Sequence, residues 1–120
     1  MDRITGKIIG AAIEVHRILG CGLLETIYAQ ALCVEFVERG ISFEQEVIVD
    51  TVYKGHTLKG QRIDLLVEKE VVVELKSVRH LSEIATAQTL SYLKATGLKR
   101  ALILNFGERI LADGIKRISL

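Results

Sequence analysis

The sequence predicts one α/β domain in which helices flank a mixed β-sheet, with the elements in the order ααβββαβ. The spacing of apolar residues changes from a helical to a strand period near residue 48 and returns to a helical period near residue 82. The 120 residues are 49% hydrophobic and 26% charged and include no proline, a composition typical of a single globular domain. This pattern indicates a single domain over residues 1–120.

Two helices are predicted in the first third of the chain. Residues 4–19 carry apolar side chains at helical spacing, and Gly20-Cys21-Gly22 then supplies a stop. Residues 23–38 repeat the pattern, and Gly40 follows where a helix would end. The strand-like pattern of apolar residues begins after this helix, near residue 48.

Three strands, arranged as a meander, are predicted next. β-Branched and aromatic residues lie at 48–53, a Lys54-Gly55-His56 turn follows, and strands are expected over 58–67 and 71–76. Helical spacing returns over 82–96, with Ser82 as the expected N-cap.

After the third helix, the sequence predicts one strand clearly and leaves two alternatives for the last twelve residues. Gly97 closes the third helix, and residues 100–106 form a continuous apolar run that suits a central strand covered on both faces. Residues 109–120 fit either a closing strand pair or a short helix.

The net charge, the cysteine spacing and the N-terminal pattern argue against several classes of protein. The formal charge of +1 lacks the basic excess that by itself indicates nucleic-acid binding. Cys21 and Cys33 have no metal-ligand spacing, which argues against a structural zinc site. The N-terminal pattern is interrupted by charges and fits neither a signal peptide nor a membrane span, so a cytoplasmic protein without membrane contact is expected.

A tight turn at residues 68–70 would place acidic side chains opposite each other on two strands. The expected facing pairs are Val67 with Val71, Leu65 with Val73, Asp64 with Glu74, and Ile63 with Leu75. Because side chains alternate along a strand, Asp64, Glu74 and Lys76 would share one sheet face, and Ile63, Leu65, Val73 and Leu75 the other.

Two opposed carboxylates need an explanation. At about 5 Å and an effective dielectric of about 20, they repel by about 3 kcal/mol, whereas favourable cross-strand pairs contribute only about 0.2 to 1 kcal/mol. A divalent cation such as Mg²⁺ would offset this repulsion, with Lys76 placed to position water or stabilise developing charge. The alternative is a shifted hairpin register, in which the three side chains form an ordinary surface salt bridge.

Several separated motifs add a resemblance to a known family. Asp64 followed by Glu74-Leu75-Lys76 resembles the signature of the PD-(D/E)XK nuclease superfamily. The run from Gly22 to Tyr28 resembles the one after which the GxxExxY proteins of that superfamily are named. The approach His16–Gly20, the helix segment Gln88–Leu93 and the stretch Leu104–Gly107 are also similar, so the resemblance covers nearly the whole chain.

This resemblance implies a restriction-endonuclease-like core and a nuclease that hydrolyses DNA or RNA with water activated by Mg²⁺ or Mn²⁺. Asp64 and Glu74 would be metal ligands and Lys76 the catalytic lysine. Glu25 would be a further acid from an early helix that completes the metal site or orients the lysine. Without the motif, Glu25 fits a first-turn acid favoured by the helix dipole.

Four further residues are candidates for a supporting role. Tyr28 lies three residues after Glu25, on the same helix face. Gln88 and Tyr92 are four apart, and the resemblance implies that they support the site or contact nucleic acid; the alternative is a solvent-facing glutamine beside a core-edge tyrosine. His16 lies near the glycine-rich turn, where a hydrogen-bonded helix-end histidine is the favoured interpretation.

The chain departs from the family pattern at two places. Cys21 stands where a proline is common, and residues 84–87 lack a histidine that often precedes the glutamine. Two other functions therefore remain open beside the nuclease. One is a nuclease-fold domain that binds nucleic acid or a protein partner without cleaving; the other is a structural homodimer module built on the apolar helices.

Overall fold

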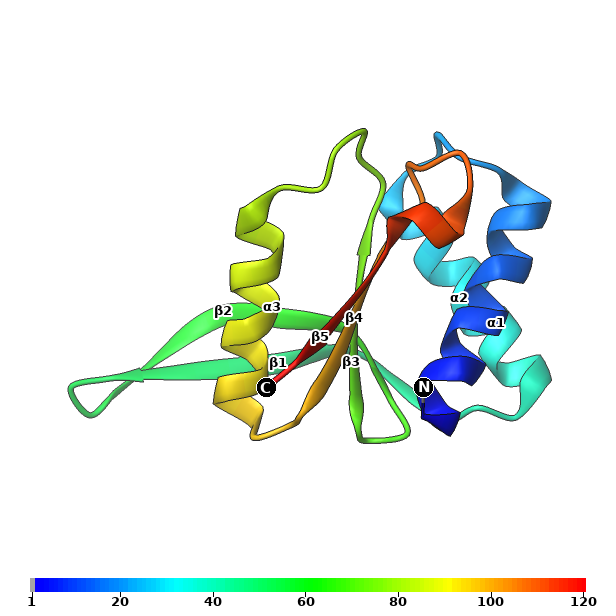
Figure 1. Cartoon of the computed structure of the whole chain (residues 1–120). Helices are drawn as coiled ribbons and strands as arrows, with labels where there is room; N and C mark the ends of the chain where they lie inside the picture. The colour runs from blue at the N-terminus through cyan, green and yellow to red at the C-terminus, as the bar shows by residue number, and fades with distance from the viewer. Residues whose placement is uncertain (1) are drawn as a thin grey trace.

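The computed structural model describes residues 2–120 and has three layers, with a central sheet between one helix on one face and two on the other (Figure 1). The helices are α1 (Arg3–Leu19), α2 (Glu25–Arg39), α3 (Glu83–Thr96) and the short 3-10 helix η1 (Leu111–Gly114). The strands are β1 (Phe43–Tyr53), β2 (His56–Val67), β3 (Val71–Lys76), β4 (Arg100–Asn105) and β5 (Ile115–Ser119).

The sheet is mixed, and its strands lie in the order β1-β2-β3-β4-β5. The pair β3 and β4 is parallel, and α3 is the crossover between them, while the other neighbouring pairs are antiparallel. This arrangement confirms the predicted mixed sheet flanked by helices and the predicted meander of β1, β2 and β3. It is compatible with a restriction-endonuclease-like fold.

Two apolar clusters hold the layers together, one on each face of the sheet. Leu65, Val73, Leu75 and Leu104 pack against α1 and α2, whereas Val72 and Ile103 pack against α3 with other residues. All six residues of β3 except Lys76 are buried, and so is β4 beyond Arg100. A strand buried on both faces needs continuous apolar sequence, as predicted for β4.

Four details differ from the sequence-based expectations, the first being that β1 begins at Phe43, five residues earlier than predicted. Residues 109–120 form neither a strand pair nor a helix alone, because η1 is followed by the single strand β5, which pairs with β4. Ser82 occupies the N-cap position of α3, but its side chain makes no capping hydrogen bond. The second helix begins at Glu25, two residues later than predicted.

None of the helices over residues 2–120 is both long and apolar enough to cross a lipid bilayer.

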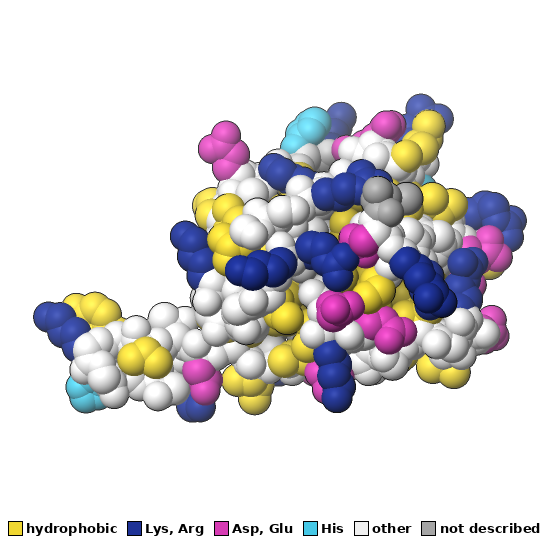
Figure 2. All heavy atoms as spheres, turned by 60° about the horizontal axis from the view of Figure 1, so that its bottom comes forward, with side chains coloured by type: hydrophobic (Ala, Val, Ile, Leu, Met, Phe, Trp, Pro, Cys, Tyr) yellow, Lys and Arg dark blue, Asp and Glu magenta, His cyan; other side chains and the backbone are white. Residues whose placement is uncertain are grey.

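The outer parts of β1 and β2 form a two-stranded ribbon that projects beyond the body of the molecule (Figures 1 and 2). Residues 50–62 are all exposed, and the turn at Lys54-Gly55 has positive φ at both positions, as two-residue hairpins favour. A register shift lies between Val49 and Thr51, where two residues of β2 oppose one of β1.

Candidate active site

Asp64 on β2 and Glu74 on β3 lie opposite each other and exchange hydrogen bonds with each other's strand. The Asp64 backbone N–H donates to Glu74 Oε1 over 3.0 Å, and the Leu75 backbone N–H donates to Asp64 Oδ2 over 2.8 Å. Two carboxylates therefore replace the backbone acceptors that a regular ladder would provide at this point. The predicted opposition of these two acids is confirmed.

The prediction that Asp64, Glu74 and Lys76 share one sheet face is wrong for Asp64. The regular pairing of β2 with β3 ends at Leu65 and Val73, so the two strands separate just where the carboxylates insert. Beyond this break Ile63 packs in the α3 cluster and does not pair with Leu75. Side-chain alternation predicts the face correctly only along an uninterrupted ladder, and the ladder of β2 with β3 is interrupted here.

Glu74 is only 4% exposed, and its environment disfavours the charged form. Burial, followed by the negative charge of Asp64, raises the pKa of Glu74 to about 8. The Asp64 N–H and the positive charge of Lys76 act in the opposite direction but do not cancel the rise. Without a nearby cation, Glu74 is therefore largely protonated at neutral pH.

This shift predicts a pH dependence of stability. The folded chain keeps a proton on Glu74 between about pH 4.5 and 8, whereas the unfolded chain has released it. The contribution of Glu74 to the free energy of unfolding is thus fully present below about pH 4.5 and is lost as the pH rises to about 8. In EDTA, chemical denaturation at several pH values should show this decline in the wild type and a flatter profile in Glu74→Gln. Glu38→Gln, a change at an exposed acid, should follow the wild type; a Glu74→Gln profile parallel to the wild type would contradict the assignment.

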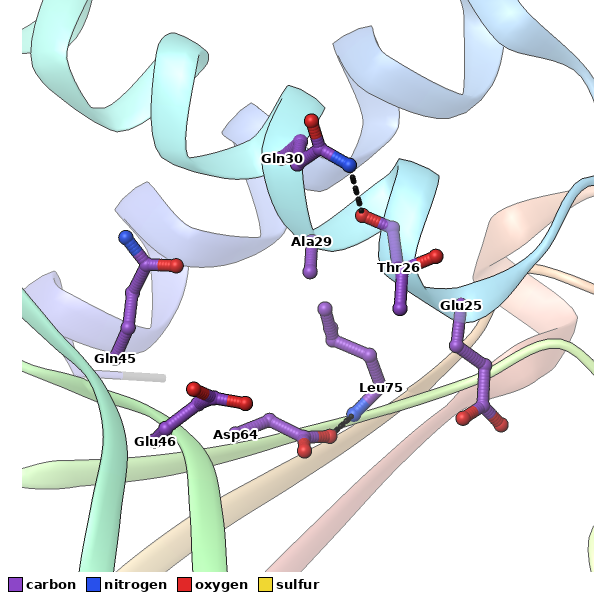
Figure 3. A pocket seen from close by; sticks show the side chains of 8 residues that line it. All are labelled: Glu25, Thr26, Ala29, Gln30, Gln45, Glu46, Asp64 and Leu75. Atoms are coloured by element: carbon purple, nitrogen blue, oxygen red, sulfur yellow. Dashed lines mark hydrogen bonds between the residues drawn. The ribbon is translucent and has the colours of Figure 1, made fainter.

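A pocket of about 290 Å³ lies between α2 and the first two strands. Asp64 and Leu75 line it from the sheet, and Glu25 lines it from the start of α2 (Figure 3). Glu46 on β1 also lines it, and Figure 3 shows its carboxylate beside Asp64. Glu46 has a φ of 49°, which is unusual for a residue other than glycine. Glu46 was not among the predicted site residues, because no local pattern in the sequence indicates its positive φ.

Lys76, the last residue of β3, lines a second pocket of about 250 Å³. Glu25 lines this pocket as well, so it stands at the junction of the two. Gln88 of α3 lines the same pocket and is exposed. The structure therefore places Gln88 and Lys76 in the lining of one pocket, and the supporting role of Gln88 stays a prediction.

Tyr92 lies one helical turn beyond Gln88 and is buried, with 3% of its surface exposed. Burial raises the pKa of its phenol, and the charges of Glu74 and Asp64 add to this rise. The phenol is thus electrostatically coupled to both acids, although it also belongs to the α3 apolar cluster. Its burial agrees with the tyrosine of the core that the sequence offered as an alternative, and its supporting role stays a prediction.

Tyr28 and His16 lie in the core behind the site. Tyr28 is fully buried, and its hydroxyl donates to the Gly20 carbonyl over 2.5 Å and accepts from the Leu23 N–H over 3.2 Å. His16 Nε2 lies 2.7 Å from the Glu108 carbonyl, which can only accept, so this nitrogen carries a proton. His16 is therefore the hydrogen-bonded helix-end histidine that the sequence favoured.

Asn105, at the end of β4, is a buried polar residue that was not among the predicted site residues. Its Oδ1 accepts from the N–H groups of Val78 and Gly107, and its Nδ2 donates to the Val78 carbonyl, each over 3.0 Å. A Cβ atom at Gly107 would lie closer than 3 Å to three backbone atoms of Val78. The stretch Leu104–Gly107 thus holds the segment that follows Lys76 in place through contacts with Val78. In the sequence, the only feature that could have pointed to Asn105 is its position at the end of a strand.

A model of the PD-(D/E)XK nuclease superfamily matches residues 2–118, nearly the whole chain. The chain belongs to the PD-(D/E)XK nuclease superfamily. Searches of curated proteins and of solved structures found no match. Membership of this superfamily, together with the mixed sheet, indicates a function of the nuclease type and a nucleic-acid substrate.

The residues of this PD-(D/E)XK site can be tested against the divalent metal that such nucleases typically use. Within residues 2–120, no three His, Cys, Asp or Glu side chains are grouped closely enough to hold an ion among themselves. Mg²⁺ needs only one or two carboxylates when water and phosphate complete its shell. Two close carboxylates, one of them buried and destabilised as an anion, fit such an ion.

Proposed function

We propose that this chain is a phosphodiesterase of the GxxExxY type that cleaves DNA or RNA with the help of Mg²⁺ or Mn²⁺. The observation that carries the proposal is the opposition of Asp64 and Glu74 at the break between β2 and β3. Two ionised carboxylates in a largely buried place are costly for a fold, so Glu74 keeps a proton in the absence of a cation, and a bound cation would take the place of that proton. Superfamily membership supports the same chemistry.

Asp64 and Glu74 would hold the metal ion, with Glu25 as a further acid at the edge of the site. When bound, the ion supplies Lewis-acid polarisation of the phosphate and lowers the pKa of water. Glu74 would lose its proton on binding, because a carboxylate coordinates as the anion. The two backbone N–H groups that bond to these carboxylates keep them in place before any ligand arrives.

Lys76 would stabilise the negative charge that develops on the phosphate oxygens and help to hold the attacking water. Its position at the end of β3, one side-chain repeat beyond Glu74, supports this role. Glu25 lines the same pocket and can orient the ammonium group, and Gln88 can donate or accept a hydrogen bond to nucleic acid there. Tyr92, next to both acids, would exclude water from the buried side of the site.

The experiment that tests the proposal separates metal binding from turnover. Lys76→Met keeps most of the unbranched side chain and removes its charge, so it should lower cleavage by about 10²-fold or more while Mn²⁺ still binds. Labelled single- and double-stranded DNA and RNA should be incubated with Mg²⁺, with Mn²⁺ or with EDTA. Mn²⁺ affinity should be measured by calorimetry on the same samples.

A matched control is Lys94→Met, a change at an exposed lysine in the last turn of α3. It should cleave like the wild type. Cleavage that persists in EDTA or is unaffected by Lys76→Met would contradict the proposal. Binding of nucleic acid or of a protein partner with no cleavage of any substrate would instead favour a non-catalytic domain of the same fold.

A further inference from the structure

Two chain segments that adjoin proposed active-site residues are linked by hydrogen bonds and by a stacked ring pair. The loop Gly20–Leu24 leads directly into Glu25, and the segment Ser77–Val78 follows Lys76. The Ser77 hydroxyl donates to the Leu23 carbonyl over 2.6 Å. This hydrogen bond links residues 54 positions apart in sequence, at the side of a pocket that Glu25 also lines.

The loop side of this link is fixed by Tyr28. Its hydroxyl bonds to the Gly20 carbonyl and to the Leu23 N–H, so both ends of the loop are tied to a side chain that is fully buried. The Tyr28 ring in turn stacks on Phe106, with ring centres 4.4 Å apart and planes 11° from parallel. The loop is therefore attached to the residue that follows β4.

The lysine side of the link is fixed by the same end of β4. The Phe106 N–H donates to the Lys76 carbonyl over 2.8 Å, and Asn105 makes its paired bonds to Val78. Ser77, Tyr28, Asn105 and Phe106, here named the clamp, thus connect the backbone on both sides of the site. None of the four reaches into either pocket that contains Asp64 or Lys76.

We propose that Ser77 is a positioning residue, which acts through the clamp to set the placement of Glu25 relative to Lys76. The inference rests on the proposed nuclease function, because it assigns to Lys76 the charge stabilisation described above. Ser77 touches neither acid of the pair, so its effect is on alignment and not on metal binding. A misplacement of about 1 Å at a catalytic group can cost about 10²-fold in rate.

The test compares Ser77→Ala with Ser77→Thr and with Ser91→Ala. Ser91 is a matched control, because its hydroxyl also donates over 2.6 Å to a backbone carbonyl but only within α3. Ser77→Ala should lower kcat by about 10- to 100-fold, with KM, Mn²⁺ affinity and the thermal midpoint close to wild type. Ser77→Thr should restore kcat, since it restores the hydroxyl, and Ser91→Ala should leave kcat unchanged.

Tyr28→Phe supplies a second, independent variant. Because the Tyr28 hydroxyl bonds to the Leu23 N–H and the Ser77 hydroxyl bonds to the Leu23 carbonyl, the two substitutions act on the same residue, and their effects on kcat should not add in the double variant. A kcat for Ser77→Ala equal to that of Ser91→Ala, or a loss that Ser77→Thr does not rescue, would overturn the proposal.

A measurement without substrate keeps this inference separate from the nuclease proposal. In the free protein, Ser77→Ala should lower the backbone NMR order parameters of Gly20–Leu24 and of Ser77–Val78 together, while Ser91→Ala should not. Unchanged order parameters in both segments would overturn the clamp even if the wild type cleaves. A wild type that cleaves nothing, with the expected loss of order, would leave the clamp standing and remove the nuclease proposal.

Discussion

Asp64→Asn is expected to lower nucleic-acid cleavage by at least about 10³-fold, a loss of about 4 kcal/mol in transition-state stabilisation. The amide oxygen of Asn can still accept from the Leu75 N–H, so the hydrogen bond that holds β3 at the break is kept. The amide nitrogen is a poor ligand for a hard cation, and the negative charge is lost. The Asp64→Asn variant should therefore lose cleavage while it keeps its fold.

Cleavage rates and Mn²⁺ binding should be measured together with the thermal midpoint. Asp50→Asn is the matched control, because Asp50 makes an exposed ion pair with Lys59 on the projecting ribbon. It should cleave and bind Mn²⁺ like the wild type. If Asp64→Asn retained both activities, Asp64 would not be a metal ligand, and the assignment of the acid pair would fail.

Phe106→Ala should cost about 3 to 5 kcal/mol in the free energy of unfolding. Phe106 is fully buried, stacks on Tyr28 and lies 6.1 Å from the His16 ring centre to centre, so its removal opens a cavity between α1, α2 and the sheet. A domain of this size is stable by only about 5 to 15 kcal/mol, so the variant would lose a large part of its stability. Denaturant unfolding monitored by circular dichroism measures this directly.

Tyr53→Ala provides the comparison for that measurement. Tyr53 is 59% exposed near the tip of the ribbon, so its removal should change the free energy of unfolding by no more than about 0.5 kcal/mol. Phe106→Leu should lose less than Phe106→Ala, because it fills part of the cavity. Equal stability of the Phe106→Ala and Tyr53→Ala variants would show that Phe106 does not carry the core contact between the helices and β4.

Local patterns in the sequence predicted most of the fold. The helical periods of α1, α2 and α3 reflect apolar faces that meet the sheet, and the uninterrupted apolar run of β4 reflects burial on both sides. The turn at residues 68–70 fixed the pairs Val67 with Val71 and Leu65 with Val73 as counted. These features depend on neighbours in sequence or on a single hairpin.

The parts that could not be predicted depend on distant segments. The separation of β2 from β3 brings Asp64 to the α2 side of the sheet. It occurs where the Asp64 and Glu74 carboxylates accept hydrogen bonds from backbone N–H groups. The alternation of side chains along a strand does not reveal such bonds. Glu46 enters the pocket through a backbone bend in β1. The role of Asn105 depends on its hydrogen bonds with Val78, a residue 27 positions earlier in the chain.

The ribbon of β1 and β2 has a consequence for how this chain can change in length. Residues 50–62 bury no side chain, so pairs of residues could be added to or removed from each strand at its tip without opening the core. Asp64 lies on the same strand, and a net slip of one residue would turn its side chain to the other face. Between the partners of Val49 and Thr51, β2 already contains one extra residue, so the register changes by one there while the pairing nearer to Asp64 is unaffected. The outer ribbon can therefore vary in length while the register at the acid pair stays fixed.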